Sequence, residues 1–139
     1  MRIIVDKSVP KEVRDCALPI IKRFSKYAPN WLNIIRVFWD SENPDATATM
    51  TTQYEYRNCA LTLCPYFFNS EPSERERTIR HEIMHLYTTP IKAEAYGCIQ
   101  KLFGSEYPTA GCAIAEEAIN KVHEAMTEDL AIFTERLDA

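Results

Sequence analysis

The sequence lacks any long hydrophobic run. No window approaches the ~18 consecutive apolar residues that a membrane-spanning helix requires, and residues 1–6 lack the apolar stretch of a signal peptide. We therefore expect a cytoplasmic protein that neither spans a membrane nor follows the usual secretory route.

Runs of positive charge and close pairs of cysteines are also missing. The formal net charge is -4 and the lysines and arginines are spread along the chain, so we expect no nucleic-acid partner. The five cysteines are an odd number without the spacing of a zinc ribbon. They fit reduced thiols in a cytosolic protein.

Length and composition predict one folded domain over residues 1–139. The chain is 46% hydrophobic and 26% charged, close to the averages of soluble globular proteins. A chain of this size buries about two thirds of its unfolded surface on folding, so it needs no metal for stability. Any metal would therefore serve function, and we expect a monomer.

The hydrophobic patterning predicts an α+β fold. Residues 13–24 carry apolar side chains at helical spacing, and Pro19 should kink or interrupt this helix. Three later stretches, 31–40, 46–56 and 58–64, have the composition or the alternation of strands. We predict an antiparallel sheet of three to four strands packed with this N-terminal helix, with an open edge at residues 58–64.

Three helices are predicted in the rest of the chain. Ser73 and Glu76 match a capping box at the start of a helix over residues 73–87, which Pro90 should end. Residues 93–103 predict a further helix, residues 104–111 a loop, and residues 113–137 the last and longest helix.

The first of these helices contains the motif His81-Glu82-Ile83-Met84-His85. Residues four apart lie one turn above each other, so His81 and His85 can share one cation. Glu82 can take a proton from a zinc-bound water. The motif uses two of only three histidines in the chain and predicts a Zn²⁺ site with Glu82 as the catalytic base.

A catalytic zinc site needs a third protein ligand. The downstream candidates are Glu94, Glu106, Glu116, Glu117 and His123. If the apolar positions 119, 122, 126, 130 and 133 form the buried stripe of the last helix, Glu116 lies at its border and Glu117 almost opposite. We therefore predict His81, His85 and Glu116 as metal ligands, with Asn120 orienting one of the histidines. Glu117 remains an alternative, and His123 would give a three-histidine site.

Hydrolysis also needs a hydrogen-bond donor for the oxyanion of the transition state. Tyr107, in the predicted loop, and His123 are the candidates for this catalytic role.

These residues resemble the zincin superfamily, and in particular the gluzincins, which combine H-E-x-x-H with a glutamate from a later helix. The matching residues are His81, Glu82, His85 and either Glu116 or Glu117. The order of elements resembles minimal gluzincins and phage-type metallopeptidases. The third histidine of metzincins is missing, because Thr88-Thr89-Pro90-Ile91 follows the motif instead.

The resemblance implies a small zincin-like domain and a zinc metallopeptidase. In such an enzyme a zinc-bound water, activated by Glu82, attacks a carbonyl group of a peptide or protein substrate. Two other hypotheses remain open. One is a catalytically silent zincin-fold module that captures a peptide or protein partner. The other is a deformylase-like enzyme with Cys59 or Cys64 as third ligand.

Overall fold

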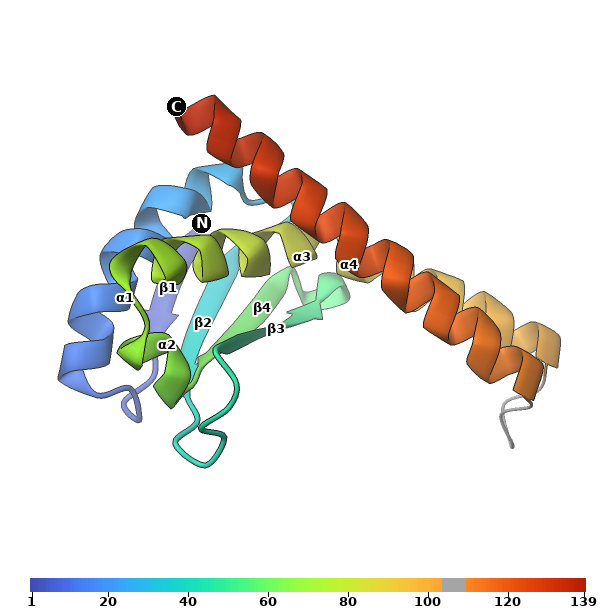
Figure 1. The fold of residues 1–139 in the computed structure, drawn as a ribbon, viewed down its shortest axis with the longest axis horizontal. Coiled ribbons are helices and arrows are strands. Elements are labelled where there is room, and N and C mark those ends of the chain that lie inside the picture. The colour runs from blue at the N-terminus through green and yellow to red at the C-terminus, as the bar shows by residue number, and fades with distance from the viewer. Residues whose placement is uncertain (104–109) are drawn as a thin grey trace.

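The computed structural model describes residues 1–103 and 110–139. Within these residues the chain forms an α+β fold, with a mixed sheet that carries helices on one face and a long hairpin of two helices (Figure 1). The elements are β1 (Arg2–Val5), α1 (Lys11–Phe24), a 3-10 turn (Ser25–Tyr27), β2 (Ile34–Trp39), β3 (Ala48–Gln53), a second 3-10 turn (Tyr54–Tyr56), β4 (Asn58–Leu63), α2 (Pro65–Asn69), α3 (Pro72–Phe103) and α4 (Ala110–Asp138).

The sheet is mixed, so the prediction of an antiparallel sheet is wrong in part. Its order is β1-β2-β4-β3, with β1 parallel to β2, β2 parallel to β4, and β3 antiparallel to β4. The α1 crossover makes β1 and β2 parallel. The loop after β2 carries the chain past one strand position, and β4 then returns into the gap between β2 and β3.

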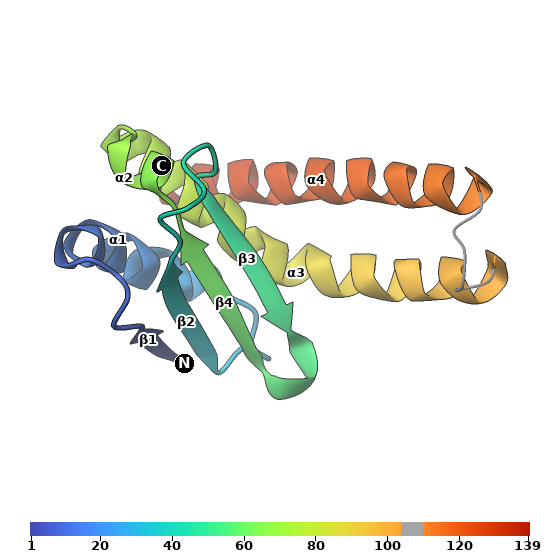
Figure 2. The same cartoon turned by 90° about the horizontal axis from the view of Figure 1, so that it is seen from below.

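This topology also moves the open edge of the sheet. The prediction gave the edge to residues 58–64, but β4 is paired on both sides, with β2 and with β3. The free edges of the sheet belong to β1, which was not predicted as a strand, and to β3. Of these two edge strands, β3 is the one that lies beside α3, the helix that carries the histidine motif (Figure 2).

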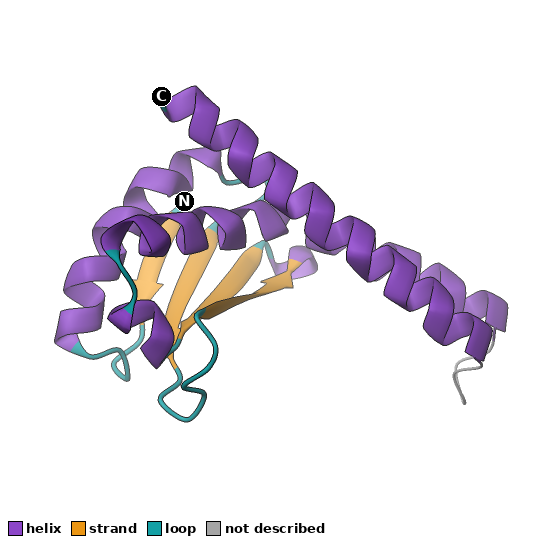
Figure 3. Ribbon diagram, viewed as in Figure 1, coloured by secondary structure: helices purple, strands orange, loops and turns teal. Residues whose placement is uncertain are grey.

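The hydrophobic core lies between the sheet and helices α1 and α3 (Figure 3). The helical spacing predicted for residues 13–24 is confirmed, and α1 continues through Pro19, which lies on its exposed face. Side chains along β2 and β4 alternate between the buried face of the sheet and its more exposed face. The core side chains include Val13, Ala17, Ile21 and Phe24 from α1, Ile35, Val37, Leu61 and Leu63 from the sheet, and Ile79, Ile83 and Leu86 from α3.

Helix α3 is one helix of 32 residues, so the predicted end before Pro90 is wrong. It begins at Pro72, so Ser73 lies inside the first turn and does not precede it as a capping residue. Pro90 removes one backbone hydrogen bond, but α3 packs against α4 on both sides of this position (Figure 2). That packing keeps the predicted helix over residues 93–103 in line with the first half.

Helix α4 confirms the predicted last helix but turns a different face inward. Its buried residues are Cys112, His123, Thr127, Ala131 and Thr134. The predicted stripe is largely outside, with Val122, Met126 and Phe133 exposed by 58%, 44% and 57%. Small and polar side chains face α3 because the two helices approach closely, as the 2.7 Å hydrogen bond between Thr88 Oγ1 and Thr127 Oγ1 shows.

Neither of these long helices, nor any other helix in residues 1–103 and 110–139, is apolar over a sufficient length to cross a membrane.

The C-terminal end of α4 is anchored by a buried arginine. Arg80 of α3 donates hydrogen bonds to Thr134 Oγ1 at 3.1 Å and to Asp138 Oδ2 at 2.9 Å. Its guanidinium lies 4.2 Å from the centre of the Phe24 ring. Lys26 and Tyr27 also donate to Asp138, and together with Arg80 they hold the pKa of this carboxyl far below its usual value. This network fixes the position of α4 relative to α1 and α3.

Replacing Arg80 with alanine should therefore lower the free energy of unfolding by about 2–3 kcal/mol, because a buried guanidinium loses its charge-assisted hydrogen bonds. In thermal denaturation this loss corresponds to a fall of roughly 10 °C in Tm for a domain of this size. The matched control is Arg23→Ala, which removes an exposed 2.9 Å ion pair with Glu76 and should cost less than about 1 kcal/mol. Equal losses in the two variants would contradict the anchoring role of Arg80.

Candidate metal centre

Three potential metal ligands meet where α3 crosses α4. His81 and His85 lie one turn apart on α3, Glu124 comes from α4, and their ligand atoms all lie within 4.8 Å of one another. The Nε2 atoms of His81 and His85 lie 3.8 Å and 4.0 Å from the same oxygen, Glu124 Oε2. Both imidazoles therefore present the same ring nitrogen to one point.

This arrangement fits a zinc ion. Nitrogen and carboxylate oxygen ligands bind zinc at about 2.0–2.2 Å, which puts neighbouring ligand atoms about 3.3 Å apart in a tetrahedron. The observed separations of 3.8 Å and 4.0 Å, with all three ligand atoms inside 4.8 Å, are wider than this value, so the side chains would draw together around an ion. Two imidazoles and one carboxylate also leave the fourth position of a tetrahedral ion for water or substrate.

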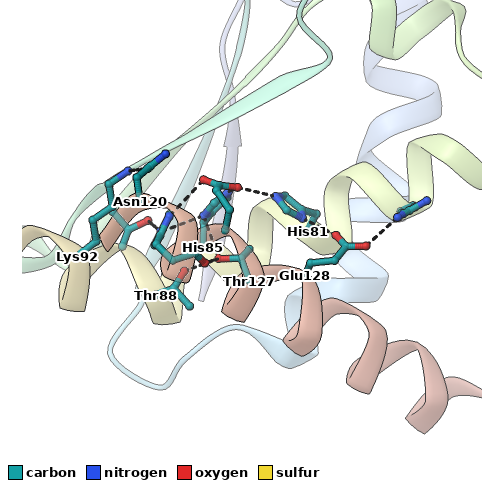
Figure 4. Close-up of polar contacts among 11 residues, drawn as sticks. His81, His85, Thr88, Lys92, Asn120, Thr127 and Glu128 are labelled. Carbon is teal, nitrogen blue, oxygen red and sulfur yellow. Dashed lines mark hydrogen bonds and ion pairs between the residues drawn. The ribbon is translucent and has the colours of Figure 1, made fainter. Parts of the chain in front are cut away.

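Glu128, one turn after Glu124, fixes the orientation of His81. Its Oε2 atom lies 3.1 Å from His81 Nδ1, and its Oε1 atom accepts a 2.7 Å hydrogen bond from Arg77 (Figure 4). The Arg77 hydrogen bond, with a further contribution from His81, lowers the pKa of Glu128. Because an ionised carboxylate only accepts hydrogen bonds, His81 Nδ1 carries the proton and Nε2 keeps its lone pair for a metal.

His123 fixes the orientation of His85. His85 Nδ1 lies 3.3 Å from His123 Nε2, and His123 Nδ1 lies 3.2 Å from Glu124 Oε1. One assignment of protons satisfies this chain, in which His85 Nδ1–H donates to His123 and His123 Nδ1–H donates to Glu124. It leaves His85 Nε2 and Glu124 Oε2 unprotonated and directed at the same point.

The surroundings of His85 and His123 favour the neutral imidazole. Burial, with a smaller effect of neighbouring His81, lowers the pKa of His85 to about 4. Burial also lowers the pKa of His123. Because a metal binds only the neutral imidazole, these shifts keep His85 in its ligand form at neutral pH.

Glu82 lines the same cleft as the three candidate ligands. Burial, with a smaller effect of the negative charge of Glu124, raises the pKa of its carboxyl to about 8, although a hydrogen bond from the Met50 amide opposes the shift. The cleft is a cavity of about 380 Å³. Its lining comes from the edge strand and the two long helices: Ala48, Thr49, Met50, His81, Glu82, His85, Thr89, Lys92, His123 and Glu124.

The predicted third ligand, Glu116, lies elsewhere. Its carboxylate is 3.7 Å from Cys112 Sγ, and its backbone carbonyl accepts a hydrogen bond from Tyr96. The alternative, Glu117, forms a 3.1 Å pair with Lys121. The structure brings Glu124 to the two histidines, where Glu116 was expected, because the face of α4 that packs on α3 differs from the predicted one.

The remaining residues that the sequence offered for the site lie away from His81 and His85 or outside the described residues. Glu94 borders a different cavity, beside Gln53 and Tyr54. Glu106 and Tyr107 lie outside the described residues. Asn120 contacts Lys92 rather than a histidine.

Cys59 and Cys64, the third ligands that the deformylase hypothesis offers, are both buried. Neither belongs to the group formed by His81, His85 and Glu124. Burial raises the pKa of Cys59 to about 12 and also raises that of Cys64. Both shifts disfavour the thiolate form that binds metal.

Sequence reasoning missed both Glu124 and Glu128. They lie one turn apart on α4, beside His123 and Thr127 on the face directed at α3. The signal that could have found them is the row of polar and small residues at helical spacing, His123, Thr127, Ala131 and Thr134. Such a row is suited to close packing against a helix that carries polar ligands.

Comparison with protein-family models, with curated proteins and with solved structures finds no match. The function of the protein is therefore inferred from the geometry and the chemistry of this site.

The raised pKa of Glu82 predicts a pH-dependent stability of the metal-free protein. The folded-state pKa of about 8 exceeds the ordinary value, so folding favours the protonated carboxyl, and stability should fall as pH rises from about 4.5 to 8. Glu82→Gln should make the metal-free protein more stable at pH 9 by on the order of 2–4 kcal/mol, and change stability little at pH 5. Urea denaturation of both proteins at the two pH values measures this, and an equal difference at both would contradict it.

Metal content tests the ligand set. We expect about one zinc per chain in untagged protein, and loss of zinc in His85→Ala and Glu124→Ala, because two remaining protein ligands bind weakly. Glu116→Ala and Glu117→Ala are the matched controls on α4 and should retain zinc. Elemental analysis distinguishes these outcomes, and zinc that depends on Glu116 but not on Glu124 would contradict the assignment.

Proposed function

We propose that this protein is a zinc-dependent metallopeptidase with a zincin-like fold. The observation that carries the proposal is the convergence of His81 Nε2, His85 Nε2 and Glu124 Oε2 beside Glu82 in one open cleft. The gluzincin pattern of two helical histidines and a glutamate from a later helix supports it, with Glu124 as the third ligand.

In this proposal His81, His85 and Glu124 hold the ion, while Glu128 and His123 orient the ligands. Zinc, when bound, supplies Lewis-acid chemistry, because it lowers the pKa of water and polarises a carbonyl group.

Glu82 is the general base and then the general acid. Its carboxylate form, disfavoured by burial in the free protein, is favoured next to a divalent cation. The carboxylate accepts a proton from the attacking water, and the resulting carboxyl donates that proton to the leaving amine. Burial thus gives Glu82 a basicity suited to moving a proton in both directions near neutral pH.

His123 supports the site through its contacts with His85 and Glu124. Because both ring nitrogens have these partners, we propose that it orients ligands and does not stabilise the oxyanion. Tyr107 remains a candidate oxyanion donor from the sequence alone.

The substrate we propose is an extended peptide or a segment of a protein. Strand β3 is an edge strand, and its residues Ala48, Thr49 and Met50 line the cleft opposite the histidines. An edge strand can pair with an extended chain through backbone hydrogen bonds. A peptide bound in this way would pass Glu82 and the proposed zinc site. We also propose that the protein is cytoplasmic, as the sequence predicts.

Glu82→Gln should abolish peptide hydrolysis while zinc stays bound. Loss of the general base should reduce kcat at least about 100-fold, whereas the three ligands are unchanged. The assay uses a pool of quenched fluorescent peptides of random sequence and zinc analysis of the same samples. Glu74→Gln, an exposed carboxylate in the first turn of the same helix, is the matched control and should keep the wild-type rate.

Chelation of the wild-type protein should stop hydrolysis, and added zinc should restore it. Equal rates in wild type and Glu82→Gln would contradict the catalytic proposal and would favour a module that binds peptides without cleaving them.

A further inference from the structure

Lys92 brings a positive charge into the proposed active-site cleft. It lies on α3 two helical turns after His85 and lines the same cavity as the metal ligands. Its ammonium donates a 2.7 Å hydrogen bond to Asn120 Oδ1 on α4 and lies 5.6 Å from the centre of the Tyr96 ring. Figure 4 shows Lys92 and Asn120 at one end of the histidine cluster and Glu128 at the other.

This charge is not neutralised within the described part of the chain. No carboxylate in residues 1–103 and 110–139 forms an ion pair with Lys92, and its hydrogen-bond acceptor Asn120 is neutral. Arg77, the cation at the opposite end of the cluster, is paired with Glu128 at 2.7 Å. The ammonium of Lys92 therefore keeps its charge available for an anionic group that enters the cleft.

The Lys92–Asn120 pair lies at a useful distance from the reacting bond. Asn120 precedes Glu124 by one helical turn, about 6 Å along α4. An extended peptide advances about 3.3 Å per residue. A separation of this length corresponds to about two residues of an extended peptide. The Asn120 amide can donate hydrogen bonds from its nitrogen while its oxygen accepts from Lys92.

We propose that Lys92, together with Asn120, binds a carboxylate of the substrate one or two residues beyond the scissile bond. The inference builds on the proposed peptidase function and gives it a substrate class. A carboxylate at this distance is either the C-terminus of the peptide, in which case the enzyme releases one or two C-terminal residues, or an acidic side chain. The same charge-assisted hydrogen bonds recognise both.

Binding measurements separate these sources without depending on turnover. The protein is zinc-loaded Glu82→Gln, and the probes are three fluorescently labelled pools of random octapeptides. The first pool has a free C-terminal carboxylate and no Asp or Glu. The second is its C-terminal amide, and the third is the amide with one Asp fixed near the end. Fluorescence polarisation gives the Kd of each pool.

We expect at least one of the two carboxylate pools to bind about tenfold more tightly than the plain amide, as charged hydrogen bonds predict. Introducing Lys92→Gln should remove this preference, and Lys92→Arg should retain most of it. The matched control, Lys101→Gln, removes an exposed lysine from the same helix and should leave the preference unchanged. Equal Kd values for all three pools, or a preference that survives Lys92→Gln, would overturn the proposal.

A digest distinguishes this failure from failure of the proposed hydrolysis. Mass spectrometry of the same pools after incubation with zinc-loaded wild-type protein locates the cleaved bonds. Cleavage one or two residues before the carboxylate, lost in Lys92→Gln, supports the proposal. Equal internal cleavage of all pools would keep the peptidase and overturn the role of Lys92. A carboxylate preference in binding without any cleavage would support the role of Lys92 and overturn hydrolysis.

Discussion

The close contact between α3 and α4 is the constraint on which the rest of the structure depends. The hydroxyls of Thr88 and Thr127, both buried, lie 2.7 Å apart across it. Only small side chains allow two helices to approach in this way, and only this approach lets Glu124 of α4 reach histidines of α3. At the far end of α4, the buried Arg80 fixes the same alignment by an ion pair with the part-buried Asp138. The register of one helix on the other thus sets the composition of the site.

Different parts of the fold provide the stability and the chemistry of the site. The apolar core lies between the sheet, α1 and the first half of α3, with Ala131 of α4 at its border. The contact of α3 with α4 also buries histidine, threonine and arginine. Polar side chains contribute less to stability than apolar ones unless every hydrogen bond is made. The chain of bonds from His85 through His123 to Glu124 gives both ring nitrogens of His123 a partner. The body therefore folds on hydrophobic burial, and α4 is held by specific polar contacts.

The parts of this architecture that depend on local pattern could be predicted from the sequence, and the parts that depend on partners could not. The placement of His81 and His85 on one face of a helix follows from helical geometry alone. The strands near residues 34–39, 48–53 and 58–63 follow from their alternation and composition. The sheet order depends on where the loop after β2 leads, which no local pattern encodes. The face of α4 was misjudged because apolar spacing normally marks the buried side, whereas here a polar site required the small and polar face.

The electrostatics of the cleft lead to the same site as the geometry. Glu82 and Glu124 line one cavity, and burial together with the charge of Glu124 makes a second negative charge on Glu82 unfavourable near neutral pH. Among the described residues no lysine or arginine forms an ion pair with Glu82 or Glu124, since Arg77 pairs with Glu128 and Lys92 contacts the neutral amide of Asn120. A divalent cation bound to His81, His85 and Glu124 would offset both carboxylates at once and restore the ionised form of Glu82. In the proposed enzyme, the residues that would hold the ion are therefore the same ones that would make Glu82 a competent base.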